Sequence, residues 1–471
     1  MFKFTSGALS RRVVLYFSMV LVQKACSLFL QPLLMRQFEP SEYGFVSQFS
    51  AVISLIVLAV TFSADEVVIR RFHQRNDRAE ANIYVASFAR FCGFVALMSA
   101  TLILTADSMY GIGNISYFSL GLIFAFVAPL VSLFQKFLRT QRKTTFLATF
   151  NAMYAILQAA SIIVLIKILG DPVWTYFFAQ ACFQSLIGVL IFLYFSRYGF
   201  SHISTGGICE VYREAAPAVP YSVVGWGFIG FTTYYVATFI GVLEAGLMGG
   251  GLYLYSLLVA LSDVSVSLVQ PISYDVRKSN GDSDVCNAAR RKIGLVVVSF
   301  LMIGSMLSAI SNEVVGFLLP AGYSQNAYVT PLLVLSGSAL GLGSVWTYFL
   351  YFEPAGVRKL SLISVFGVLF NVILVPALSY FFSVIGALTS LLIVTVFVAF
   401  YKGYFSFGYI RITFLEFSFV WVGYIVLALF SISYVYFEIG FFGKLLSQVA
   451  VCLPLSYLLL KYSFKRFEVV F

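Results

Sequence analysis

A lysine stands in the middle of a long apolar segment near the start of the chain. Lys24 is followed by Ser27 at i+3 and Gln31 at i+7, and a helix places all three side chains on one face. An ammonium group at mid-membrane costs about 3 kcal/mol on insertion scales, so it should not face lipid. One interpretation is a hydrated cavity in which Lys24 and Gln31 contact an anion. The other is tight packing of helices through polar side chains.

Other polar side chains lie on faces that could share this cavity. We name Arg71, Arg90, Asn151 and Gln158 as further candidate contacts. Arg90 either reaches the cavity or extends to the cytoplasmic interface. Arg71 either lines the cytoplasmic mouth or only sets the topology. For the amides, hydrogen bonding between packed helices is the alternative.

Two carboxylates and three helix-bending residues complete the candidate set. Asp65 and Asp263 are candidate coupling groups, carboxylates that would bind and release a proton or a cation, and Asp263 could instead be the partner of a buried cation. Pro220, Gly225 and Pro376 are candidate gating positions, since Pro and Gly let a membrane helix bend. Tight packing is the alternative at these positions.

The elements that must position these side chains are apolar segments long enough to cross a bilayer. Hydrophobic residues make up 60% of the chain and charged residues 11%, too few to hydrate the surface of a soluble domain. Because a spanning helix needs about 20 apolar residues, the segment lengths predict an all-α integral membrane protein rather than a β-barrel. Fourteen spans are expected, at residues 13–35, 42–64, 81–105, 115–138, 146–169, 173–195, 215–240, 246–270, 292–319, 328–352, 358–380, 384–405, 413–434 and 440–461.

Basic residues occupy every second loop between these segments. The alternate loops hold only Arg36, Lys167 and Lys444 and are otherwise acidic. By the positive-inside rule, both termini are predicted to be cytoplasmic. The net charge of +10 is thereby explained by topology, and we expect no nucleic-acid partner.

Cysteine and histidine placement argues against metal or redox chemistry. The six cysteines match neither a disulfide framework nor a metal-ligand spacing. His73 and His202 both fall in predicted cytoplasmic loops, which disfavours a histidine proton relay across the membrane. We therefore expect no cofactor, no metal and no catalytic residues.

A weak internal repeat suggests two halves. A shift of 207 residues aligns Gly44 with Gly251, and Arg70 and Arg71 with Arg277 and Lys278. The segment 196–214 is expected to be a linker between the halves, because it is long, charged and contains paired glycines. The predicted organisation is a six-helix bundle at 1–200, a second at 201–405, and two additional helices at 406–471.

Three stretches resemble the polysaccharide flippases of the multidrug/oligosaccharidyl-lipid/polysaccharide exporter superfamily. The first is EPSEYGFVSQFSAVISLIVLAVTFSADEVVIRRF at 39–72, with the acidic-Tyr-Gly turn and the Arg-aromatic pair of that family. The second is LRTQRKTTFLATFNA at 138–152, which is similar to the basic loop into their fifth helix. The third is LFNVILVPALSYFFSVIGALTSLL at 369–392, with Asn371 and Pro376 in place.

The resemblance implies a MATE-like fold and a transport activity rather than an enzyme. The cargo would be an oligosaccharide repeat unit of O-antigen lipopolysaccharide, capsule or exopolysaccharide, linked to undecaprenyl pyrophosphate and moved across the inner (cytoplasmic) membrane by alternating access. The implied partners are this lipid-linked oligosaccharide, membrane lipids and other glycan-assembly proteins, with an H⁺ or Na⁺ gradient as the drive. A mid-membrane cation such as Lys24 would offset part of the desolvation cost of a pyrophosphate.

Two departures from the family limit what is carried over. Helix 7 of many relatives has an Asp-Arg pair where this chain reads Thr232-Thr233-Tyr234-Tyr235. The acidic residues that drug-extruding relatives carry in helix 1 are absent, and Lys24 stands there instead. An exporter of drugs or other small molecules on the same fold remains the alternative. A polysaccharide polymerase is disfavoured, because the longest predicted loops are cytoplasmic.

Overall fold

The computed structural model describes residues 31–74, 77–110, 115–141, 143–199, 205–278, 283–323, 328–351, 354–406, 414–434 and 441–463. Within these ranges the regular structure is helical, and ten helices are long and apolar enough to cross a membrane. The predicted all-α membrane fold is therefore confirmed. The count of fourteen spans stays a prediction, since most of the first span lies outside the described residues.

The chain folds as two compact units, Met1–Trp226 and Gly227–Phe471. The passage from one to the other falls inside the helical segment that the sequence assigns to the seventh span. The three-part organisation at 1–200, 201–405 and 406–471 stays a prediction.

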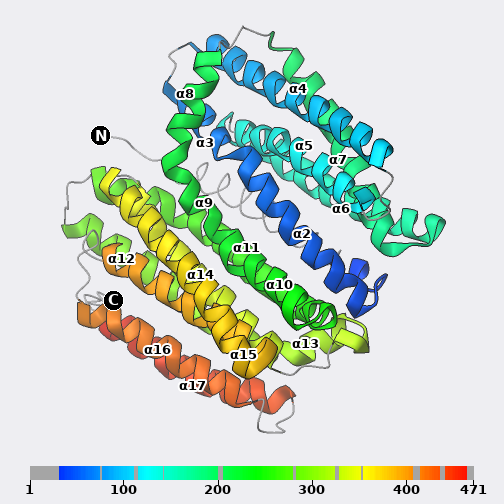
Figure 1. The fold of residues 1–471 in the computed structure, drawn as a ribbon. Helices are drawn as coiled ribbons and strands as arrows, with labels where there is room; N and C mark the ends of the chain where they lie inside the picture. The colour runs from blue at the N-terminus through cyan, green and yellow to red at the C-terminus, as the bar shows by residue number, and fades with distance from the viewer. Residues whose placement is uncertain are drawn as a thin grey trace. The chain divides into compact units, whose positions relative to one another are not determined.

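The first unit is a bundle of long helices with short connections. Its elements are α2 (Pro40–Thr61), α3 (Ala64–Gln74), α4 (Arg78–Tyr110), α5 (Ile115–Thr140), α6 (Thr144–Leu169), α7 (Pro172–Ser196), α8 (Thr205–Ala215), η1 (Ala216–Ala218) and α9 (Val219–Gly225). Helices α4, α5 and α7 pack side by side (Figure 1).

Local sequence explains how two of these helices begin. Pro40 opens α2, and the Glu42 carboxylate accepts a hydrogen bond from the Glu39 backbone N–H at 2.9 Å. Pro172 opens α7, and the Asp171 side chain accepts from the Trp174 N–H at 3.0 Å. In each case a carboxylate satisfies an N–H that has no partner within the helix.

The second predicted span is broken near its C-terminal end. Phe62 and Ser63 have φ values of 47° and 56°, and they separate α2 from α3. Left-handed backbone is unfavourable for residues other than glycine, so surrounding contacts must hold it in place. The Ser63 and Ser222 hydroxyl oxygens lie 2.6 Å apart, which joins this break to α9.

The expected linker between the halves contains a helix. Helix α8 (Thr205–Ala215) buries Val211 and Ala215 among side chains of α3, α4, α5 and α7. These two residues are four apart, so they lie on one helical face. Docking of that face gives the segment a structure that its charge and its paired glycines did not indicate.

The second unit also consists of long helices. Its elements are η2 (Trp226–Gly230), whose first residue closes the first unit, α10 (Phe231–Tyr235), η3 (Val236–Ile240), α11 (Val242–Lys278), α12 (Ser283–Ala309), α13 (Ser311–Leu318), η4 (Ala321–Tyr323), α14 (Val329–Tyr351), α15 (Pro354–Ser406), α16 (Phe414–Ser433) and α17 (Phe441–Ser463). Both η2 and η3 are π-helical turns.

Helix α15 is a hairpin of two helices that turns at Ser383, where φ is 53° and ψ is −133°. The Ser390 hydroxyl donates to the Leu374 carbonyl across the hairpin at 2.9 Å. A Cβ atom at Gly386 would collide with the Leu378 carbonyl, so only glycine permits this close approach of the two arms. The two arms correspond to the predicted spans at 358–380 and 384–405.

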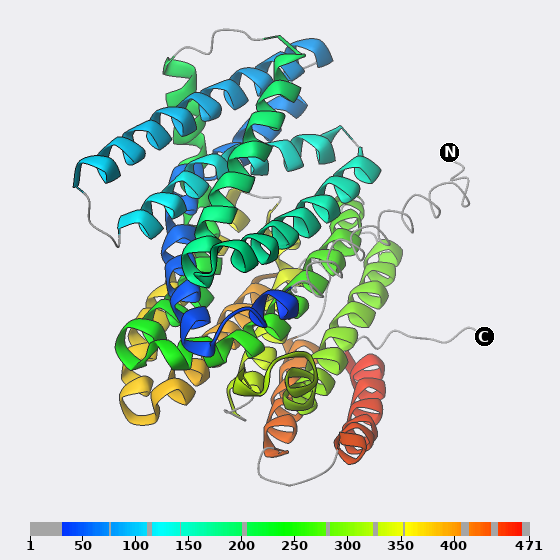
Figure 2. The same ribbon diagram turned by 90° about the vertical axis from the view of Figure 1, so that its right-hand side faces the viewer.

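The last two helices are integral to the second unit. Helices α16 and α17, orange and red in Figure 2, pack against α12 and against each other. Buried polar contacts join them: the Gln448 amide donates to the Ser431 hydroxyl at 3.0 Å, and Ser431 donates to the Ser305 carbonyl at 3.1 Å. Lys444 of α17 pairs with Glu313 of α13 at 2.6 Å.

Candidate functional site

Asp65 lies directly after the break between α2 and α3 and forms a buried polar cluster with α5. Its carboxylate accepts from the Ser132 hydroxyl at 2.5 Å and pairs with the Lys136 ammonium at 2.8 Å. Ser132 and Lys136 are four residues apart and share a face of α5. Only 5% of the Asp65 side chain is exposed, so its charge depends on these partners rather than on water.

A cavity of about 190 Å³ adjoins this cluster. Asp65 and Thr61 line it from the two sides of the helix break, and Tyr212 of α8 closes part of it. Burial raises the pKa of Tyr212 to about 12, so the phenol stays neutral and can donate a hydrogen bond at physiological pH. The volume is below the roughly 300–1,000 Å³ of typical ligand pockets. It suits waters or a small ion, not an oligosaccharide.

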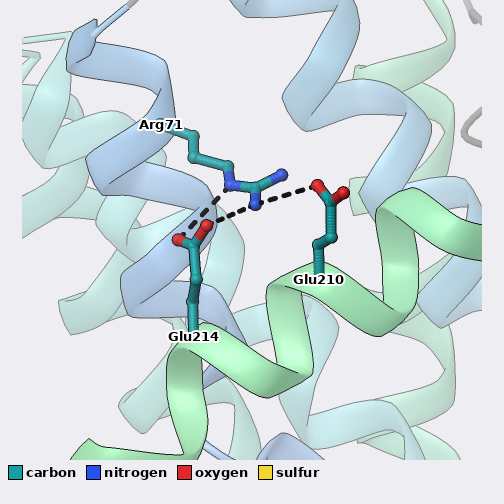
Figure 3. Close-up of polar contacts among 3 residues, drawn as sticks. All are labelled: Arg71, Glu210 and Glu214. Carbon is teal, nitrogen blue, oxygen red and sulfur yellow. Dashed lines mark hydrogen bonds and ion pairs between the residues drawn. The ribbon is translucent and has the colours of Figure 1, made fainter.

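Arg71, at the C-terminal end of α3, lies between two carboxylates of α8 (Figure 3). Its Nη2 atom is 2.5 Å from Glu214 Oε1 and 3.4 Å from Glu210 Oε2, and its Nε donates to Glu214 Oε2 at 3.5 Å. Because Arg71 donates hydrogen bonds to the Glu214 carboxylate, the pKa of Arg71 is raised. The three formal charges sum to −1. The guanidinium therefore serves to dock α8, which makes it a poor candidate for anionic cargo in this arrangement.

The polar stripe of α6 is partly used for packing inside the first unit. The Gln135 amide of α5 donates to Asn151 Oδ1 at 3.1 Å, and the Tyr154 hydroxyl donates to the Gln184 side chain of α7. Gln158 is half-buried on the same helix. These bonds match the packing alternative for Asn151, while Gln158 stays a candidate cavity contact.

Only some of the remaining candidate side chains are among the described residues. Lys24 and the side chain of Asp263 lie outside them, so their roles stay predictions. Gln31 is half-buried, and its amide donates to the Tyr43 hydroxyl at 3.4 Å. Arg90 is exposed on α4 and borders a groove against α7. Neither this groove nor the cavity beside Asp65 is lined by Gln31 or Asn151.

The gating candidates fall in helices with distinct irregularities. Pro220 and Gly225 lie in α9, and Pro376 lies inside the first arm of α15. A Cβ atom at Gly225 would meet nothing within 4 Å, whereas one at Gly227 would lie 2.5 Å from Val368 Cγ2. Packing therefore requires glycine at Gly227 but not at Gly225, which leaves bending as a reason for Gly225.

Asn371 supports the π-helical turn η2 from within the second unit. Its amide donates to the carbonyls of Gly227 at 2.9 Å and Phe228 at 3.3 Å, and to the Thr232 hydroxyl at 3.2 Å. A π turn displaces carbonyls from their usual helical partners, and a buried carbonyl needs a donor. This gives Asn371 a physical role that its sequence motif did not indicate.

Three interactions were missed from the sequence. In the sequence, Lys136 was only one of the basic residues that predict the topology. Glu210 and Glu214 lay in the expected linker at 196–214. Their spacing held a signal: Ser132 and Lys136 are at i and i+4, as are Glu210 and Glu214. Each pair projects from one helical face, but spacing does not identify the residue opposite it.

Comparison with known proteins establishes the fold. No family model matches the chain, and no curated protein matches it significantly. Among solved structures, the lipid II flippase MurJ in an inward closed conformation aligns with a TM-score of 0.60 at 13% identity, over 95% of this chain and 98% of that one. A MATE protein in complex with MaL6 aligns with a TM-score of 0.57 at 14% identity, over 87% and 97%. An inward-facing multidrug resistance MATE transporter of the MOP superfamily aligns with a TM-score of 0.53 at 15% identity, over 87% and 99%.

The chain has the MurJ and MATE fold. That fold consists of the α-helical membrane bundles described above.

Proposed function

We propose that the protein is a flippase for a lipid-linked oligosaccharide, moving an undecaprenyl-pyrophosphate-linked repeat unit across the cytoplasmic membrane by alternating access. The glycan would belong to O-antigen, capsule or exopolysaccharide, and the protein would perform no covalent chemistry. Both termini would lie in the cytoplasm. Other glycan-assembly proteins would supply the cargo and take it onward.

The observation that carries this proposal is the extent of the likeness to a lipid flippase. The MurJ alignment covers 95% of the chain, whereas the MATE alignments described above cover 87%. The three flippase-like stretches of sequence point to the same class of cargo.

Charge placement supports an anionic cargo. A lysine ammonium at the centre of the first span would contact the pyrophosphate, with Gln31 as a hydrogen-bond donor on the same face. Asp65 would couple transport to an H⁺ or Na⁺ gradient. Its carboxylate lines a small cavity beside a broken helix, and it would exchange its Lys136 partner for a proton or a cation during the cycle. Asp263 is the second coupling candidate.

The test is complementation in cells that make a lipid-linked repeat unit but lack their own flippase. The chain should restore surface glycan, and Lys24→Ala should abolish it while lipid-linked units accumulate inside. Lys167→Ala is the matched control, because this exposed lysine lies at the C-terminal end of α6. Normal surface glycan with Lys24→Ala, at wild-type protein levels, would contradict the proposed role of the lysine.

A second candidate is an exporter of drugs or small molecules, favoured by the MATE alignments over 87% of the chain. It predicts that loss of the protein raises toxin sensitivity and leaves surface glycan unchanged. Measuring both phenotypes in the same deletion strain separates the two functions.

A further inference from the structure

A groove lies on the first unit between α4 and α7, with α5 as its floor. Its volume is about 350 Å³. The wall is apolar, and its large side chains are accessible: Leu97 is 64% exposed and Val189 is 57% exposed. Arg90 and Ser185 supply the only side chains in the lining that carry polar atoms. Such a surface takes a hydrocarbon chain rather than a sugar.

Small residues keep this groove open. A Cβ atom at Gly93 would lie 2.9 Å from the Phe192 ring, and one at Gly188 would lie 2.6 Å from Val127 Cγ1. These glycines, which line the groove, let the helices approach closely, as small residues do between membrane helices. Two residues of the groove lining therefore have no side chain that could fill it.

A cation stands at one end of the groove. Arg90 is exposed and lies within the candidate span Ala79–Ile103. Helical side chains tilt toward the N-terminus of their helix. A long side chain at this position is therefore expected to reach toward the N-terminal end of α4, where a charged group can extend to the interface. From Arg90, the groove extends toward the C-terminal end of α4, past Leu97 to Ala100.

The dimensions fit one lipid chain. Ten residues separate Arg90 from Ala100 on α4, which is about 15 Å at 1.5 Å per residue. That length is half of the roughly 30 Å hydrocarbon core, the depth of one leaflet.

The groove is distinct from the cluster around Asp65. The small cavity beside Asp65 is lined by Phe88, Cys92 and Val95 of α4, whereas the groove is lined by a different set of α4 residues that includes Arg90 and Leu97. Its single cation can hold a phosphate, but it has no polar wall for an oligosaccharide.

We propose that this groove is a binding site for an anionic phospholipid. The guanidinium of Arg90 binds the phosphate, one acyl chain lies along the groove, and the second chain stays in the bilayer. This site does not depend on which cargo the protein transports.

The test uses the full-length protein purified in detergent, with native mass spectrometry during titration with phosphatidylglycerol or phosphatidylcholine. Arg90→Gln should weaken phosphatidylglycerol binding about fivefold, equivalent to the ~1 kcal/mol of one basic residue near an anionic lipid surface. Arg90→Lys should retain most of the binding. Leu97→Trp, which fills the groove from an exposed position, should weaken both lipids. Arg213→Gln, an exposed arginine of α8, is the charge-matched control and should bind like wild type.

Several outcomes would overturn the assignment. Arg90→Gln could bind phosphatidylglycerol as wild type does, or Arg213→Gln could lose as much affinity as Arg90→Gln. Undecaprenyl phosphate could displace phosphatidylglycerol in an Arg90-dependent way at equal concentration, and the groove would then belong to a single-chain carrier lipid. Unchanged thermal unfolding of each variant shows that the fold is intact.

Discussion

At the residue scale, two charged contacts of the first unit differ in burial. Asp65 is 2.8 Å from Lys136 and nearly inaccessible, whereas Arg71 meets Glu214 at a partly exposed position. A buried pair is fragile, because removing one member leaves the other charge without compensation. An exposed pair contributes little to stability, because water and salt screen it.

The Asp65–Lys136 pair should therefore show strong coupling. Lys136→Met is expected to destabilise the fold by about 3 kcal/mol, since it removes the ammonium group that pairs with the buried carboxylate. The double variant Asp65→Asn/Lys136→Met should regain most of that loss. The measurement is a double-mutant cycle: thermal unfolding in detergent of the wild type, both single variants and the double variant. Additive losses would show that the two side chains do not depend on each other.

The Arg71 contact should instead control the docking of α8. Arg71→Gln and Glu214→Gln are each expected to change stability by less than about 1 kcal/mol. Amide hydrogen exchange across Thr205–Ala215 should nevertheless become faster in both. Glu210→Gln should have a smaller effect, because its contact is longer at 3.4 Å and its side chain is 69% exposed. Equal protection of α8 in all variants would contradict a docking role.

The pH dependence of this contact follows from the direction in which the pKa of Arg71 is shifted. Glu214 raises the pKa of Arg71 above its ordinary value of 12.5. The stabilisation from arginine ionisation is thus complete below that value and lost only as the pH rises through the higher pKa of the folded state. We expect no change from Arg71 between about pH 6 and pH 9, which exchange measurements across that range can check.

At the element scale, the helical segment at the passage between the two units is irregular. The chain leaves the first unit through α9 and enters the second through the π turn η2. In the second unit, Asn371 supplies donors to the carbonyls of that turn. Such a turn is an irregularity held by a specific side chain, and π turns are frequent at functional sites.

Gly225 and Gly227 form a matched pair for testing bending against packing. Gly225→Ala should keep or raise stability, by up to about 1 kcal/mol from helix propensity, while it slows transport. Gly227→Ala should destabilise by about 1–3 kcal/mol, because its methyl group would collide with Val368. Transport assays in proteoliposomes and thermal unfolding separate the two effects. Wild-type transport by Gly225→Ala would remove this residue from the gating set.

At the scale of the whole molecule, the protein is a multi-pass membrane protein whose accessible surface is rich in large apolar side chains. The alternation of basic and acidic loops predicts an orientation in which α8 is cytoplasmic.

Cys209, an exposed free thiol on α8, allows a direct test of that orientation. In a variant that keeps only this cysteine, a membrane-impermeant maleimide should label inverted vesicles and not intact cells. A variant with its only cysteine at Lys167→Cys should show the opposite pattern. Labelling of Cys209 in intact cells would reverse the predicted topology.

The fold class and the positions of the membrane spans could be predicted from the sequence, because both depend on local properties of the chain. The length of an apolar run decides whether a helix can cross a bilayer, and this holds whatever the helix packs against. The spans predicted at 42–64, 146–169 and 173–195 accordingly match Pro40–Thr61, Thr145–Leu169 and Pro172–Ser196 to within a few residues.

The pairing of polar side chains was decided only by the tertiary structure. Arg71 and Glu214 are 143 residues apart, and Asn371 reaches a carbonyl 144 residues away. Helical periodicity assigns each of these residues to a face, but the neighbour of that face depends on how the helices pack. The helix within the predicted linker at 196–214 was not foreseen for the same reason, since it is stabilised by burying Val211 and Ala215 against the bundle.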